Sequence, residues 1–163
     1  MNYSDAFLKE LEAETPASRK CVERIPETLF GWKPHEKSMA LGYLTLLVAE
    51  ILRWIQVALE DNEIDFATFK HFQPKNTAEL VANFDENVKK AKNALRAAND
   101  ETFSKHFELK RNGELLFKVP MVANISSTIN HWVHHRGQLT VYMRLNNIAV
   151  PSIYGPSADE RTF

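Results

Sequence analysis

The apolar residues of four separate segments recur every three or four positions, and this period constrains the fold more than any other feature. It is clearest in one run: Leu41, Leu44, Val48, Ile51, Leu52, Ile55 and Leu59. Side chains at this spacing form a stripe along one face of an α-helix, which is stable only when the stripe is buried. The segment "LGYLTLLVAEILRWI" is interrupted by Thr45, Glu50 and Arg53, so it is too short and too polar to span a bilayer. It is predicted to be a core helix from a cap at Ser38 to about Asp61.

Two further segments with the same period are predicted to form the first and third helices. Ser4 is placed to cap the first, and Pro16 is expected either to kink that helix or to begin a new turn. Asn76 and Glu79 have the spacing of a capping box at the start of the third helix, which is expected to end near Asn99.

A short hairpin is predicted to precede the last helix. In "FELKRNGELLFKV", two alternating runs flank Asn112-Gly113, a dipeptide that accepts positive φ at both centres of a type I′ turn. Beyond Pro120 an apolar-periodic segment continues to about Asn147, and Pro151 prevents a longer helix. The expected fold is therefore all-α, a four-helix bundle with crossover loops and a small β-hairpin, in one domain over residues 1–163.

The charge composition and the single cysteine narrow the function classes. Twenty basic and 21 acidic side chains leave a net charge of −1, without a basic tract to neutralise a row of phosphates. Nucleic acid and membrane are therefore not expected partners. Cys21 cannot form an internal disulfide and is interpreted as a packing residue, and the acidic, amphipathic start "MNYSDAFLKELEAE" does not resemble a signal peptide. These features predict a cytoplasmic protein.

The stretch "NHWVHHRGQL" contains the candidate site residues. His131 and His135 are four positions apart and lie about 40° apart on one helix face, where two imidazoles can bind one divalent ion. The alternative is a pair hydrogen-bonded to Gln138, to Tyr142 or to a neighbouring helix. A zincin helix is excluded because that motif needs a glutamate at the position of Trp132.

The neighbours of the histidine pair receive structural interpretations. His134 points about 60° to the other side of His131, and Arg136 points about 140° away, which favours an ion pair or a packed aliphatic stem. Gly137 is predicted to allow close helix approach. The tail "PSIYGPSADE" has a turn signal at Gly155-Pro156 and is expected to fold back over the bundle.

Two long stretches carry a resemblance to a known family. The sequences "NHWVHHRGQLTVYMRLNNIAVPSIYGPSADE" and "IPETLFGWKPHEKSMALGYLTLLVAEILRWI" are similar to the C-terminal signature and the second-helix region of the DinB-like (YfiT-like) metalloenzyme family. The resemblance implies an up-down-down-up four-helix bundle and a homodimer. It also implies a divalent metal, zinc or nickel, held by three histidines, and in some relatives the transfer of a low-molecular-weight thiol to an electrophile.

The chain departs from the family pattern at one ligand position. The family's second helix reads Leu-Gly-x-Leu-x-x-His-x-Ala-Glu, whereas this chain reads "LGYLTLLVAE", with Leu47 in the place of the histidine. Metal binding through His131 and His135 is therefore expected to be weak or absent. The candidate substitute ligands are Glu50, His35 and His71.

Two functions follow from these expectations. One is a metal-dependent enzyme, in particular a thiol S-transferase with a degenerate site. The other is a metal-free, non-catalytic module that binds a small molecule or mediates dimeric interaction.

Overall fold

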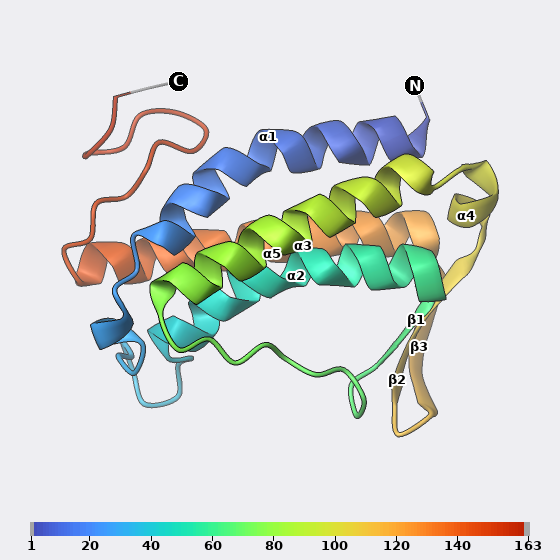
Figure 1. Cartoon of the computed structure of the whole chain (residues 1–163), viewed down its shortest axis with the longest axis horizontal. Helices are drawn as coiled ribbons and strands as arrows, with labels where there is room; N and C mark the ends of the chain where they lie inside the picture. The colour runs from blue at the N-terminus through green and yellow to red at the C-terminus, as the bar shows by residue number, and fades with distance from the viewer. Residues whose placement is uncertain (1, 162–163) are drawn as a thin grey trace.

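The computed structural model describes residues 2–161, and within this range the chain is mostly helical. Its long helices are α1 (Tyr3–Glu23), α2 (Leu41–Asp61), α3 (Thr77–Ala97) and α5 (Met121–Leu145), which lie side by side in Figure 1. Helix α2 packs against α3 and α5, and α1 packs against the same two helices. Two short helices, η1 (Glu27–Leu29) and α4 (Asp100–Ser104), lie in the connections and were not predicted.

Helix α2 forms the centre of the core. All seven residues of its predicted apolar stripe are buried. By length and composition alone this helix could cross a membrane, so the sequence argument from its shortness was wrong. However, 72% of its apolar window is buried inside the protein, which is the environment of a core helix.

The helix starts were predicted with mixed success. Asn76 caps α3 as expected, since its side chain accepts the Glu79 N–H at 2.8 Å. The first helix begins earlier than predicted because Asn2 is its cap. Ser4 lies inside α1, where its hydroxyl donates to the Leu95 carbonyl. Ser38 is not a cap either, because α2 begins only at Leu41.

Helix α1 continues through Pro16 without interruption, so the predicted new turn does not form. Proline in a helix interior leaves a carbonyl of the preceding turn without its usual donor. In the same region the Thr15 hydroxyl donates to the Leu11 carbonyl at 2.6 Å, and the Ser18 hydroxyl donates to the Glu14 carbonyl at 2.9 Å. These two hydroxyls lie on either side of the proline, and both supply donors to carbonyls that precede it.

The hairpin is present and belongs to a slightly larger sheet. Strands β2 (His106–Arg111) and β3 (Glu114–Pro120) pair antiparallel, with positive φ at Asn112 and Gly113 as a type I′ turn requires. The unpredicted strand β1 (Glu63–Asp65) adds in parallel to β2. The Asp65 carboxylate accepts the N–H groups of Asn112 and Gly113 at 3.0 and 2.7 Å, which fastens the hairpin turn to β1.

The tail folds back as predicted. Arg136 is 1% exposed and forms a buried ion pair with Glu14, and it also donates to the Ser18 hydroxyl at 3.1 Å and the Tyr154 hydroxyl at 2.8 Å. Glu160 pairs with Lys20 on α1 and with Arg24 directly after that helix, which holds this part of the tail beside α1 (Figure 1). The tail is thus fixed by charges from both α1 and α5.

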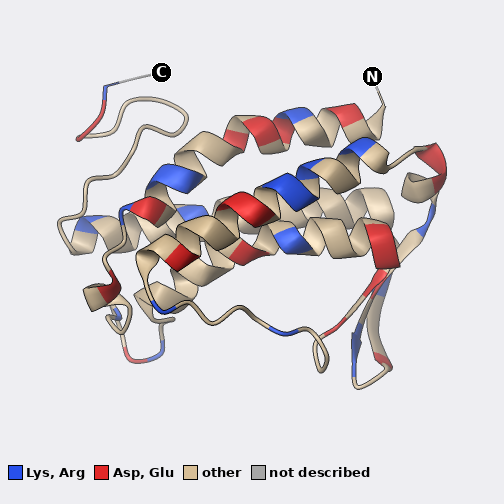
Figure 2. Cartoon of the chain, viewed as in Figure 1, with Lys and Arg blue, Asp and Glu red and all other residues tan. Residues whose placement is uncertain are grey.

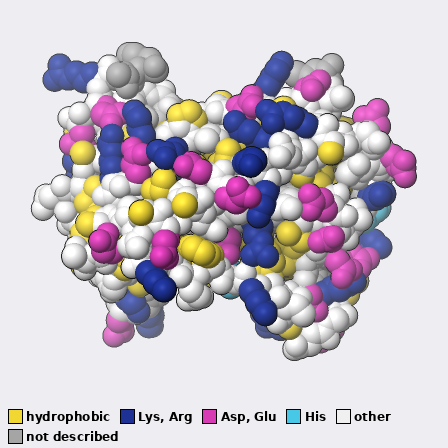
Figure 3. Space-filling model, in the orientation of Figure 1, with side chains coloured by type: hydrophobic (Ala, Val, Ile, Leu, Met, Phe, Trp, Pro, Cys, Tyr) yellow, Lys and Arg dark blue, Asp and Glu magenta, His cyan; other side chains and the backbone are white. Residues whose placement is uncertain are grey.

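Cys21 is fully buried, and burial raises the pKa of its thiol to about 11. The thiol is therefore protonated at neutral pH and packs as a small apolar group. Elsewhere, basic and acidic residues are scattered along the helices without a segment of one sign (Figure 2). They are mixed with apolar side chains on the face seen in Figure 3.

The expected close approach at Gly137 is wrong, because a Cβ added there would meet nothing within 4 Å. The close approach occurs at Gly42, where an added Cβ would lie 2.7 Å from Cβ of Phe30 and 3.1 Å from its Cα. The contact closes the loop between η1 and α2, since the Gly42 N–H donates to the Phe30 carbonyl at 2.9 Å.

Two alanine substitutions should therefore change stability in opposite directions. Gly137→Ala should raise the free energy of unfolding by about 0.5–1 kcal/mol, because alanine restricts the unfolded chain and favours an exposed helix. Gly42→Ala should lower it by about 1–3 kcal/mol, because Phe30 must move. Urea denaturation of both variants measures the difference, and a stabilised Gly42→Ala protein would contradict the assigned packing.

Candidate functional site at a histidine pair

His131 and His135 are brought together on α5 as their spacing predicted. Their Nε2 atoms are 2.8 Å apart and their ring centroids 4.6 Å apart. His135 is 8% exposed, and His131 is partly buried. The rings of His131 and Trp54 are in edge contact, with their centroids 5.8 Å apart. The pair thus lies between the core and an aromatic side chain of α2.

The hydrogen bonds assign the proton positions in this pair. The Gln138 side-chain oxygen lies 2.8 Å from Nδ1 of His135, and because that oxygen can only accept, Nδ1 carries the proton. In neutral His135 the Nε2 atom then holds a lone pair, and His131 donates its Nε2–H to it. This is the alternative arrangement considered for the sequence, with Gln138 as the partner. Tyr142 instead packs against Trp32, with their ring centroids 5.5 Å apart.

Burial keeps both imidazoles in the neutral form. It lowers the pKa of His131 below its usual value, and the nearby His135 and His134 lower it further. Burial likewise lowers the pKa of His135, with a smaller contribution from His134, while the bond to Gln138 opposes the shift. Neutral imidazole is the form that can accept a hydrogen bond or bind a metal.

Trp132 fixes the position of the histidine pair along the axis of α2. Its side chain is fully buried, and its indole N–H donates to the Val48 carbonyl at 2.8 Å. Because Trp132 follows His131 and Val48 follows Leu47, this bond places the Leu47 turn of α2 beside the His131 turn of α5. Leu47, the position at which the resemblance implies a metal ligand, thus lies at the level of the pair along α2.

His131 also lines a cavity of about 190 Å³ between α2, α5 and the sheet. The apolar part of the lining comes from α2 and all three strands: Trp54, Ile64, Phe107, Leu109 and Phe117. The polar part comes from one face of α5: Asn124, Ser127, Thr128 and His131. The sequence did not reveal this cavity. The alternation of Phe107 and Leu109 indicated one apolar face of the hairpin but not which helices it would cover.

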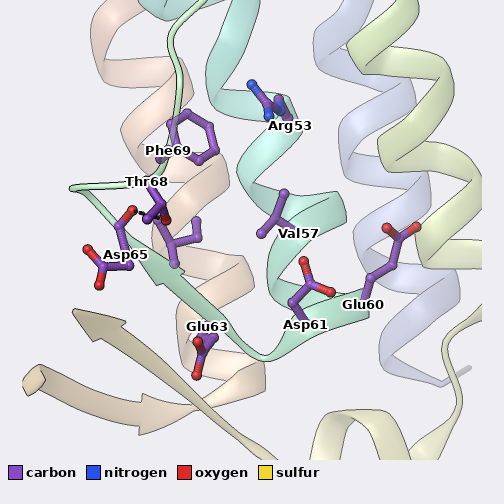
Figure 4. A pocket seen from close by; sticks show the side chains of 9 residues that line it. Arg53, Val57, Glu60, Asp61, Glu63, Asp65, Thr68 and Phe69 are labelled. Carbon is purple, nitrogen blue, oxygen red and sulfur yellow. Dashed lines mark hydrogen bonds between the residues drawn. The ribbon is translucent and has the colours of Figure 1, made fainter. Parts of the chain in front are cut away.

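A larger, more open pocket is lined by the C-terminal part of α2, by β1 and by the residues that follow β1. It does not include the histidines. Figure 4 shows its carboxylates spread around the rim, including Glu60, Asp61 and Glu63. Asp65 belongs to this rim, but its carboxylate is used by backbone N–H groups, which lower its pKa. The histidine pair and its cavity therefore form the stronger candidate site.

The sequence comparisons define the family. The model of the DinB family matches residues 1–162. The chain belongs to the DinB family.

Several relatives agree with this membership. The uncharacterized protein YrdA of Bacillus subtilis (strain 168) is 26% identical over 157 residues, which cover 96% of this DinB chain and 90% of YrdA. The DinB-like protein YjoA from Bacillus subtilis has a similar structure, with a TM-score of 0.73 and 17% identity over 96% of this chain and 99% of YjoA. A DinB-like protein from Bacillus cereus ATCC 10987 has a TM-score of 0.70 and 19% identity over 92% of this chain and 97% of its own. These two structures support the fold.

The donor set of this DinB protein does not fit a three-histidine metal centre. Leu47 is 9% exposed and offers no donor atom. Across residues 2–161, no group of three or more His, Cys, Asp or Glu side chains is arranged to hold a metal ion. Two imidazole ligands of a tetrahedral zinc ion, each about 2.0–2.1 Å from it, would also place their nitrogens about 3.3 Å apart, wider than the observed hydrogen bond.

The substitute ligands suggested by the sequence are engaged elsewhere. Glu50 is 1% exposed, and its carboxylate is bound by Nδ1 of His71 at 2.5 Å and by the Phe72 N–H at 2.8 Å. It therefore anchors the loop before α3. His35 lies in an exposed loop, where its Nδ1 accepts the Lys37 N–H at 3.1 Å. None of these hydrogen bonds connects Glu50, His71 or His35 to the histidine pair.

Proposed function

We propose that this DinB protein binds a small organic molecule in the cavity beside the histidine pair. The observation that carries the proposal is that His131 lines the cavity and also bonds through Nε2 to His135. A concave, mainly apolar site with a few convergent polar groups is the usual form of a small-molecule site. Nδ1 of His131, the ring nitrogen that these bonds leave available, would accept a hydrogen bond from a polar group of the ligand. The aromatic and aliphatic side chains would cover the apolar part of the ligand.

The proposal has a direct test that needs no metal. A set of small fragments is added to chelator-treated protein, and binding is followed by NMR of the His131 imidazole and the Trp54 indole. Fragments that bind should shift both signals together, because both side chains line the cavity. A screen that moves neither signal would contradict the proposal.

A second candidate is the metal-dependent thiol S-transferase implied by the family resemblance. The convergence of the two Nε2 atoms favours it, because a modest separation would aim both at one zinc or nickel ion. Its substrate would be a low-molecular-weight thiol. The up-down-down-up connectivity, the homodimer and the cytoplasmic location belong to either candidate, and the long connections between the helices support that connectivity.

Leu47→His distinguishes an incomplete metal site from a site that never used a metal. If only the α2 ligand is missing, the variant should bind one zinc ion per chain at least about 10-fold more tightly than the parent, or about 1.4 kcal/mol. Calorimetric titration with zinc measures this gain.

The control is the double variant Leu47→His, His135→Ala, which should lose the gain because one imidazole of the pair is gone. Zinc should also raise the thermal stability of Leu47→His, since an ion that binds the folded state stabilises it. Equal zinc affinity of the parent and Leu47→His would show that Leu47 is not an empty ligand position.

A further inference from the structure

We propose that the cavity takes an uncharged, planar ligand with a single aromatic ring and one polar substituent. This inference rests on the proposed function and specifies its ligand class. Three properties of the cavity carry it: its size, the aromatic side chains around it and the absence of permanent charge in its lining.

The size limits the ligand to about one ring. The cavity holds about 190 Å³. For comparison, an engineered apolar cavity of about 150 Å³ in another protein binds benzene. One ring with a small substituent would therefore fill the space, whereas a fused, multi-ring molecule would require the walls to separate.

The lining favours an aromatic ring over a saturated one. Trp54 on α2 and the Phe107–Phe117 pair on the hairpin border the same space, with the two phenylalanine centroids 6.4 Å apart and their planes at 56°. Rings in such a setting can accept a further ring in offset or edge-to-face contact, which adds to the burial of apolar area. Trp54 comes from α2 and the two phenylalanines come from the hairpin, so aromatic rings border the space from two elements.

The polar lining favours a neutral ligand with a hydrogen-bonding group. None of the lining residues carries a permanent charge, so an ionic group would lose its hydration without gaining a partner. The Asn124 amide and the Ser127 hydroxyl have no hydrogen-bond partner among the described residues. The Thr128 hydroxyl, in contrast, donates a hydrogen bond to the Asn124 carbonyl at 2.8 Å. The two free groups lie on the α5 wall with His131, where they can bind a hydroxyl or amide substituent.

Three probes of similar size test the ligand class by NMR titration: phenol, cyclohexanol and benzoate. Phenol should bind at least about fivefold more tightly than cyclohexanol, which keeps the hydroxyl but lacks the ring. Benzoate should bind at least about tenfold more weakly than phenol because its carboxylate must be desolvated.

Two matched variants locate the binding. Ser127→Phe places a large side chain into the cavity rim and should abolish phenol binding. Ser126→Phe puts the same side chain one position away, at an exposed site outside the lining, and should leave binding unchanged. Circular dichroism of both variants establishes that the helices remain folded.

The outcomes separate the ligand class from the proposed function. Cyclohexanol that shifts His131 and binds as tightly as phenol would overturn the aromatic inference but support a small-molecule site. Equal binding of benzoate would overturn the neutral ligand in the same way. Loss of phenol binding in Ser126→Phe as well would overturn the location. If no probe or fragment moves His131 or Trp54, the proposed function itself fails.

Discussion

Arg136→Ala is expected to lower the free energy of unfolding by about 3–5 kcal/mol. Arg136 is buried and supplies hydrogen bonds to Glu14, Ser18 and Tyr154, so the truncation leaves several polar groups without their charged donor. Breaking a buried ion pair by removing one partner is strongly destabilising because the remaining charge stays poorly solvated. In a protein of this size the melting temperature should fall by roughly 10 °C.

Arg19→Ala provides the matched control. Arg19 pairs with Glu23 and Asp85, but its side chain is 41% exposed. Removing an exposed pair usually changes the free energy of unfolding by less than about 1 kcal/mol, because water replaces the lost contacts. Thermal and urea denaturation should therefore separate the two variants clearly. Similar losses would mean that Arg136 contributes no more than a surface ion pair.

Trp132→Ala should have a comparable effect, about 3–5 kcal/mol, because it empties a large volume at the contact between α2 and α5. The indole is fully buried and lies near Phe84, with a ring-centroid distance of 6.3 Å. Trp132→Phe keeps an aromatic ring but loses the N–H bond to Val48, so it should cost less, about 1–3 kcal/mol. Urea denaturation of the two variants separates the free energy lost with the packed volume from that lost with the hydrogen bond.

The same pair of variants also tests the histidine site. If the Trp132 hydrogen bond fixes the position of α5 along α2, Trp132→Phe should stay folded while the NMR signals of His131 and His135 shift. An unchanged His131–His135 environment would show that the neighbouring packing suffices. Equal losses of stability in Trp132→Phe and Trp132→Ala would assign the effect to the hydrogen bond rather than to the lost volume.

The long helices could be predicted because each has enough turns for its apolar period to stand out. Helix α2 and helix α5 follow that period over more than twenty residues. Strand β1 has three residues and helix α4 has five, so neither is long enough to show a period. Gly137 misled because a helical glycine can signal close packing, yet only the position of Phe30 decides that Gly42 is the crowded one.

The histidine pair could be predicted for a related reason, since spacing along one helix fixes which side chains are neighbours. The rest of the site depends on contacts between distant segments. Glu50 was a plausible ligand until its contacts with His71 and Phe72 were known. The cavity brings Trp54 and Phe117 together from opposite ends of a long stretch of chain, and no local pattern encodes that meeting.

The attachment of Asp65 to the hairpin turn has a consequence for the order of folding. A hairpin with a tight turn can form locally within microseconds, but joining it to β1 closes a loop of more than forty residues that contains all of α3. We therefore expect the sheet over the cavity to be completed late, after the helices are in place. Edge elements held by few bonds also open at lower free energy than a buried helix. Backbone amides of β1 should accordingly exchange with solvent long before those of α2, and such opening would give the proposed ligand a way out without global unfolding.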